Sequence, residues 1–194
     1  MADRPLALPA AGGDHRRPVL TVGVLLVAAA GLMLFGTLVA TYLHLRTLTE
    51  RWPPRGVSID QYIGNMAMLT LVMSSVTMEW ARSALRRGLR RQALAALGVT
   101  LALGLAVVNL ISYAADQSRF DAASHPYGLV VTAMVMLLGI AVAVGVALLT
   151  LTLFRVVGRQ VSESAPQQMH ATAWYWQFAV VVAVPVWYTI VVLK

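Results

Sequence analysis

The chain has 194 residues, of which 59% are apolar and only 12% are charged, and its mean hydropathy is +0.72. Soluble domains carry about 25% charged residues, so this composition excludes an ordinary water-soluble protein and indicates a bilayer as the surrounding solvent. The absence of cysteine excludes disulfides, thiolate metal sites and cysteine nucleophiles. The net charge of +7 comes from arginines placed between long uncharged runs, which is typical of membrane topology signals rather than of nucleic-acid binding.

The first uncharged run covers residues 18–45, 28 residues in all. About 20 apolar residues cross a hydrocarbon core, so this run predicts a tilted transmembrane helix. The run is too long, and too weakly marked by a small-residue cleavage site, to be a cleaved signal peptide. Residues 1–17 are polar and contain proline and glycine, which predicts a flexible cytoplasmic leader.

Four more runs predict transmembrane helices at about 59–84, 92–115, 127–154 and 172–193. The second is the most polar, with Glu79 and Arg82 placed to pair near the membrane interface. The short connection around Gly88 makes the second and third helices an antiparallel hairpin. Pro185 is expected to kink the last helix near one end. The predicted fold is therefore all-α, a polytopic bundle of five transmembrane helices over residues 18–194 that forms one domain.

The arginines predict the orientation of this bundle. The leader and the loops after the second and fourth helices carry 10 cations, against 5 on the other side. Cytoplasmic loops hold the excess of Lys and Arg, so the N-terminus is predicted inside and the C-terminus outside.

Three kinds of chemistry are alternatives to simple packing of these side chains. His44 and His125 lie at the same predicted membrane boundary, where a haem-binding cytochrome would need a facing pair, but boundary histidines are more often solvated. Methionines on the second helix could bind Cu(I), although irregular spacing favours packing. A small transporter or channel remains an alternative, but it would need more polar lining than Asn65, Ser74 and Asn109 offer. The chain itself shows no catalytic motif.

The sequence does contain devices for helix association. Gly98 and Ala102 are four residues apart, as are Ala141 and Gly145, a spacing that lets helix backbones approach closely in lipid. Polar and aromatic residues in or near the spans could bond across helices or contact a neighbouring subunit or lipid. The candidates for such contacts are Asn65, Ser74, Ser75, Thr77, Trp174, Trp176 and Gln177.

The order of these features resembles subunit III of the haem-copper oxidases, in the short bacterial form with five helices. The likeness runs from about Gly31 onward. It includes the first-helix ending GLMLFGTLVATYLHLR, Trp52-Pro53-Pro54, Asn65, Leu69, Ser74-Ser75, Thr77, Ala81, Ala84 and Gly88, then Tyr127-Gly128, and a last helix ATAWYWQFAVVVAVPVWYTIVVL that is similar to the family's closing Tyr-Trp-His-Phe-Val-Asp and Val-Trp.

The resemblance implies a non-redox membrane subunit of the aerobic respiratory chain. Such a subunit packs against the catalytic subunit I, which would hold the haems and copper, while this chain would hold no cofactor. It also implies bound lipid in a cleft and support for proton uptake and for the endurance of turnover.

Several polar positions of the family are changed in this chain. The family's acids fall at Gly31 and near Ser112, its histidine pair at Val135 and Leu138, and its final His and Asp at Gln177 and Val180. Removing titratable groups argues against a proton-antenna role. The resulting hypothesis is an accessory subunit of a bacterial haem-copper oxidase in the inner membrane, with an accessory subunit of a nitric oxide reductase as an alternative.

Overall fold

The computed structural model describes residues 19–49, 52, 61–117, 125–158 and 165–193. These residues form five α-helices: α1 (Val19–Leu48), α2 (Gln61–Arg86), α3 (Arg90–Gln117), α4 (Pro126–Val157) and α5 (Ala165–Trp187), which continues into a π-helical turn, η1 (Tyr188–Val192). The all-helical prediction is confirmed. The predicted leader, residues 1–17, lies outside the described residues.

In the part of the chain that the structure describes, four helical segments are long and apolar enough to cross a membrane: Leu20–Leu48, Arg90–Asp116, Pro126–Val157 and Gln168–Val192. Helix α2 is not among them, although its 26 residues would reach across. Its polar residues lower its hydropathy, so a fifth span at α2 stays a prediction.

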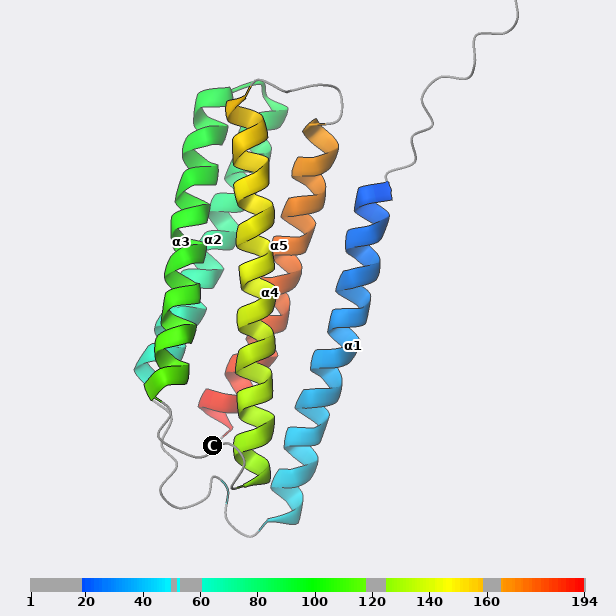
Figure 1. The fold of residues 1–194 in the computed structure, drawn as a ribbon, viewed down its shortest axis with the longest axis vertical. Helices are drawn as coiled ribbons and strands as arrows, with labels where there is room; N and C mark the ends of the chain where they lie inside the picture. Colours follow the sequence, from blue (N-terminus) through cyan, green and yellow to red (C-terminus); the bar gives the residue numbers. More distant parts are fainter. Residues whose placement is uncertain (1–18, 50–51, 53–60, 118–124, 159–164, 194) are drawn as a thin grey trace, which may run out of the picture.

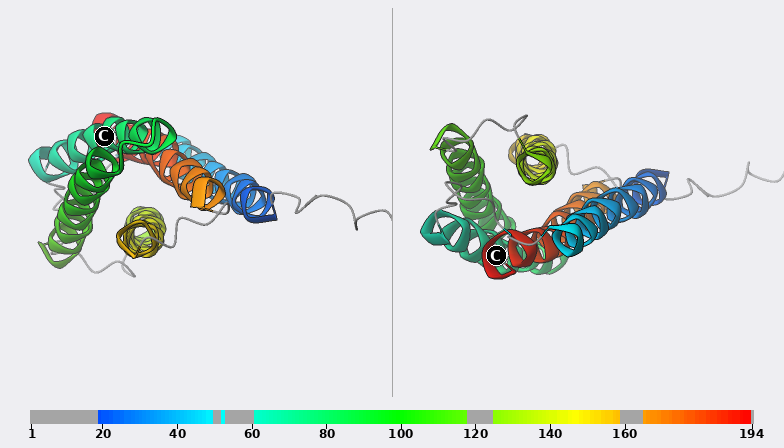
Figure 2. Two further views of the ribbon diagram at one scale, coloured as in Figure 1. Left: turned by 90° about the horizontal axis from the view of Figure 1, so that it is seen from above. Right: turned by 90° about the horizontal axis from the view of Figure 1, so that it is seen from below.

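The helices form an angular arrangement when viewed along their axes (Figure 2). Helices α2, α5 and α1 follow one another along one arm, α3 forms the other arm, and α4 lies in the angle between them. The contacts agree, because α5 packs against α1, α2 and α4, while α3 packs against α2 and α4. Helix α5 is thus the central element of the bundle (Figure 1).

A glycine turn makes α2 and α3 the antiparallel pair that the sequence predicts. Gly88 has φ of +72°, in the left-handed region that glycine tolerates best. The Gly88 N–H donates to the Leu85 carbonyl at 3.0 Å, and the Leu89 N–H donates to the Ala84 carbonyl at 3.0 Å. These are the two bonds of a Schellman C-cap, which satisfies carbonyls that the end of α2 would leave unpaired.

Both ends of α5 differ from a regular α-helix over the predicted residues 172–193. Helix α5 begins at Ala165 instead of near residue 172, because the polar segment that precedes the apolar run is itself helical and proline is tolerated in a first turn. Near its other end, the chain changes to π-helical geometry at Tyr188, three residues after Pro185, and Thr189 Oγ1 donates to the Pro185 carbonyl at 2.9 Å. Proline disrupts regular bonding in the helix interior, and here the disruption is accommodated by a wider turn.

At the α2–α3 end of the bundle, one arginine ties two helices together. Arg90, at the start of α3, donates from Nη2 to the carbonyls of Val156 at 3.0 Å and Val157 at 2.7 Å. These carbonyls lie in the last turn of α4, where a cation is favourable and acceptors are otherwise unpaired.

Candidate functional site

The polar side chains predicted for contacts gather mainly along the seam between α2 and α5. Trp176 Nε1 on α5 donates to Ser74 Oγ on α2 at 3.0 Å, and Ser74 Oγ in turn donates to the Leu71 carbonyl at 2.6 Å. Both side chains are fully buried. Polar bonds between helices are useful in lipid, because an unpaired polar group there has no water to bind.

Directly beside this bond, Gln177, the next residue on α5, bridges the same two helices. Its Oε1 accepts from Ser75 Oγ at 2.8 Å, and its Nε2 donates to Glu79 Oε1 at 3.3 Å. Glu79 also accepts from Arg82 Nη1 at 3.2 Å, which confirms the predicted pairing of these two residues. A continuous series of hydrogen bonds therefore runs from Ser75 to the Glu79–Arg82 ion pair.

Trp176 occupies the centre of the bundle because two glycines make room for it. A Cβ at Gly104 on α3 would lie 2.7 Å from Trp176 Cη2, and one at Gly145 on α4 would lie 2.8 Å from Trp176 Cε3. Four helices thus meet around a single indole ring. The small-residue spacing singled out Gly145, but Gly104 was missed, because its partner is distant in sequence and no local pattern marks it.

The remaining candidates divide between internal contacts and the bundle surface. Thr77 Oγ1 lies 2.8 Å from Thr100 Oγ1 across the α2–α3 interface, and Trp187 Nε1 donates to Asn65 Oδ1 at 2.9 Å. Trp174 is 49% exposed. The structure does not bring Trp174 together with the seam, and contact of any of the candidates with a partner or lipid stays a prediction.

At the positions where the chain departs from the resembled family, most of the residues take part in apolar contacts between helices. Gly31 faces Phe178 so closely that any added Cβ would overlap the ring of Phe178. Val180 is buried in the core around Trp176, and Leu138 packs against the buried clusters. Ser112 donates to the Val108 carbonyl of its own helix at 2.9 Å.

His44, His125 and the described methionines of α2 do not converge on a site. His44 and His125 are both exposed, and within the described segments no group of three or more His, Cys, Asp or Glu residues lies together. Met78 is fully buried, whereas Met66 and Met73 are exposed. These described side chains therefore lie in different environments and do not form a common set of metal ligands.

Comparison with known proteins decides the family. The family model for cytochrome c oxidase subunit III matches residues 10–193. The chain belongs to the cytochrome c oxidase subunit III family. Among its relatives named cytochrome c oxidase subunit 3, that of Strongylocentrotus purpuratus is 30% identical over 133 residues, covering 68% of this chain and 51% of the relative. That of Branchiostoma lanceolatum is 32% identical over 133 residues, with the same coverage of 68% and 51%. That of Prototheca wickerhamii is 26% identical over 180 residues, or 88% of this chain and 69% of the relative.

The subunit III resemblance and the membrane character drawn from the sequence are thus confirmed, and a place in the respiratory chain follows from the family. The chain spans about half the length of most of these relatives. Family membership does not favour a transporter, a channel or a nitric oxide reductase subunit.

Proposed function

We propose that this subunit III family protein is a non-catalytic accessory subunit of a bacterial haem-copper respiratory oxidase. In this proposal it packs against the catalytic subunit I, which holds the haems and copper, and stabilises the assembled complex. The observation that supports this proposal is that polar and apolar side chains occupy different parts of the bundle. The polar groups of the α2–α5 seam bond to one another, whereas the outer faces of the helices present apolar and small side chains.

A face of α3 supports the association step. Ala95, Gly98, Ala102, Ala106 and Asn109 recur at helical spacing, and all are exposed or half-exposed. A Cβ added at Gly98 would meet no atom within 4 Å. Small residues on a membrane helix let a second backbone approach closely, and an amide can add a hydrogen bond between helices. This face therefore suits a neighbouring transmembrane helix.

We infer the orientation from the distribution of charge. The end of the bundle where α2 and α4 finish and α3 and α5 begin carries the basic residues Arg82, Arg86, Arg87, Arg90, Arg91 and Arg155. By the positive-inside rule, we expect this end of the bundle to lie on the cytoplasmic side of a bacterial inner membrane.

The test is co-purification from a mild detergent by a tag on this chain. We expect a haem-containing subunit to co-migrate and show its absorption spectrum. The variant Ala102→Leu should reduce the yield of that complex, while Ala40→Leu, a matched change at an exposed position of α1, should not. If no haem protein co-migrates with the unmodified chain, the proposed function is wrong.

A further inference from the structure

Asn109, in the apolar segment of α3, carries a side-chain amide that the bundle does not use. The side chain is exposed, and no described residue makes a hydrogen bond with it. Two other carboxamides of the helices differ in this respect. Asn65 accepts from Trp187 Nε1 at 2.9 Å, and both ends of the Gln177 amide bond to side chains of α2. The amide of Asn109 therefore lies on the outer surface of α3 with its hydrogen-bonding capacity unspent.

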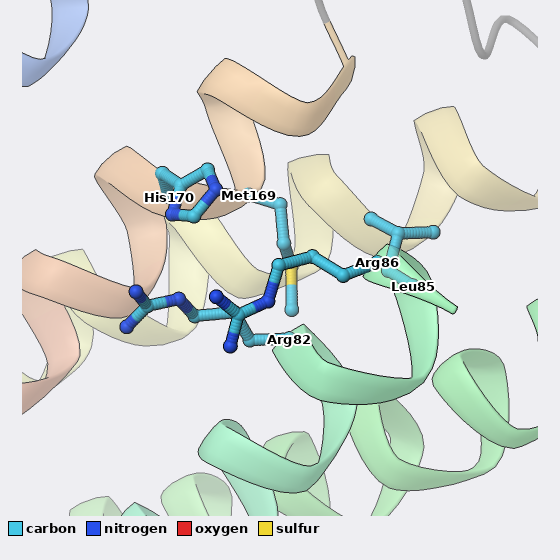
Figure 3. Close-up of a pocket in the computed structure, with 5 residues that line it drawn as sticks. All are labelled: Arg82, Leu85, Arg86, Met169 and His170. Carbon is cyan, nitrogen blue, oxygen red and sulfur yellow. The ribbon is translucent and has the colours of Figure 1, made fainter. Parts of the chain in front are cut away.

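The depth of Asn109 separates it from polar groups near the helix ends. Figure 3 shows such groups, Arg82, Arg86 and His170, around a pocket of about 260 Å³ where α2 ends and α5 begins. Asn109 instead lies about two turns before Asp116, the last residue of the apolar segment of α3, which is about 10 Å along the helix axis. An asparagine side chain is too short to reach the interface from there, unlike the long side chains of lysine and arginine. The surrounding hydrocarbon offers it no hydrogen-bonding group.

The residues beside Asn109 allow a second helix to come close. Ala102 and Ala106 are exposed on the same face of α3, and a Cβ added at Gly98 would meet no atom within 4 Å. Small residues let two membrane helices approach, which brings a short side chain within reach of the facing helix. The amide then specifies the occupant of this face, because only a helix with a polar side chain at the same depth can satisfy it.

We propose that Asn109 forms a hydrogen bond with a polar side chain on a transmembrane helix of the partner oxidase subunit and so fixes the position of that helix along α3. This inference rests on the proposed function and adds to it the residue that sets the register of the contact. A single asparagine can determine the register of two packed helices while contributing little to their stability. Asn109 is thus a positioning residue for assembly.

The first test is co-purification of the haem-containing subunit by a tag on this chain in mild detergent. Asn109→Leu should reduce the ratio of haem to tagged chain by about threefold, the change expected for one hydrogen bond between membrane helices. Asn109→Gln keeps the carboxamide and should retain more of the complex than Asn109→Leu does. Ser112→Ala is the matched control and should leave the ratio unchanged, because Ser112 Oγ already donates to the Val108 carbonyl of its own helix.

A measurement on the chain alone separates assembly from folding. Since Asn109 has no partner in the part of the bundle that the structure describes, Asn109→Leu should not lower the free energy of unfolding of the isolated chain. A loss of stability there would show that the amide serves the fold and would overturn the inference.

The second test uses the two asparagines of the chain, Asn65 and Asn109. Asparagine labelled with nitrogen-15 in its side-chain amide gives two signals in magic-angle-spinning spectra, and Asn109→Leu assigns them. We expect the Asn109 signal to shift between the chain alone and the assembled complex. The Asn65 signal should keep its position, because this amide is already bonded to Trp187.

An unchanged Asn109 signal in the assembled complex, or equal haem ratios for the unmodified chain and Asn109→Leu, would overturn the inference and leave the proposed function intact. A shift of the Asn109 signal that depends on the concentration of the chain alone would also overturn it, because the occupant would then be a second copy of this chain. Failure of the unmodified chain to bring down any haem protein would refute the proposed function and this inference with it.

Discussion

The packing around Trp176 can be tested on α3, because the same change from glycine to alanine can be made at one position that contacts the indole, Gly104, and at one that does not, Gly98. Gly104→Ala places a methyl carbon 2.7 Å from Trp176 Cη2 and 3.0 Å from Val146 Cγ2. Carbon atoms prefer about 3.5–4.0 Å, so α3 must move away from the indole. Gly98→Ala, almost two turns earlier on α3, places its methyl carbon in open space.

Both variants gain the same intrinsic helix preference of alanine over glycine, about 1 kcal/mol. Only Gly104→Ala has the cost of overpacking, about 1–3 kcal/mol. We therefore expect the free energy of unfolding to differ between the two variants by about 1–3 kcal/mol, with Gly98→Ala the more stable. The ring cannot move aside, since Trp176 has 0% exposure and Gly145 contacts it from α4.

The assay is reversible unfolding of the full chain in mixed micelles of mild detergent and dodecyl sulfate, followed by far-UV circular dichroism. A double-mutant cycle with Trp176→Phe adds a second criterion. Phenylalanine removes the outer ring atoms that collide with the new methyl, so Gly104→Ala should cost much less in that background. Equal stability of Gly104→Ala and Gly98→Ala would refute the reasoning, as would an unchanged cost in the presence of Trp176→Phe.

Three further predictions follow from other positions. Gly31→Asp should lower the free energy of unfolding through the overlap with Phe178, and Phe178→Ala should relieve that overlap; additive losses in the double variant would contradict the contact. Gly88→Ala should cost about 1–2 kcal/mol because of its left-handed φ alone, and Gly88→Asn less, in the same unfolding assay; equal costs would argue against a backbone origin. Since the chain has no native cysteine, Thr47→Cys and Gln92→Cys can report the orientation. A membrane-impermeant maleimide should label Cys at position 47 in intact cells and Cys at position 92 only after lysis. The reverse pattern would show that the predicted topology is inverted.

The sequence predicted the helices well because their signals are local. Long uncharged runs mark the apolar segments, and a lone glycine among arginines marks the α2–α3 turn. The start of α5 was placed too late for the same reason. Hydropathy records where apolar residues begin, whereas the helix extends into the preceding polar segment.

The partners of each side chain could not be predicted in this way. Ser75 and Gln177 are 102 residues apart, as are Ser74 and Trp176. Several relative rotations of α2 and α5 would satisfy the hydropathy pattern equally well. The contacts that distinguish them, Trp176 with Ser74 and Gln177 with Ser75, join residues that no local pattern relates.

The central place of α5 has a consequence for biosynthesis. Helices α1, α2 and α4 each pack against α5, yet the ribosome makes α5 after all of them. Until it enters the bilayer, the indole that fills the middle of the bundle is missing, and α1 lacks the most extensive of its contacts with the other described helices. The earlier helices therefore remain incompletely packed until the last segment has been synthesised, and an unfinished chain exposes the faces that α5 would cover.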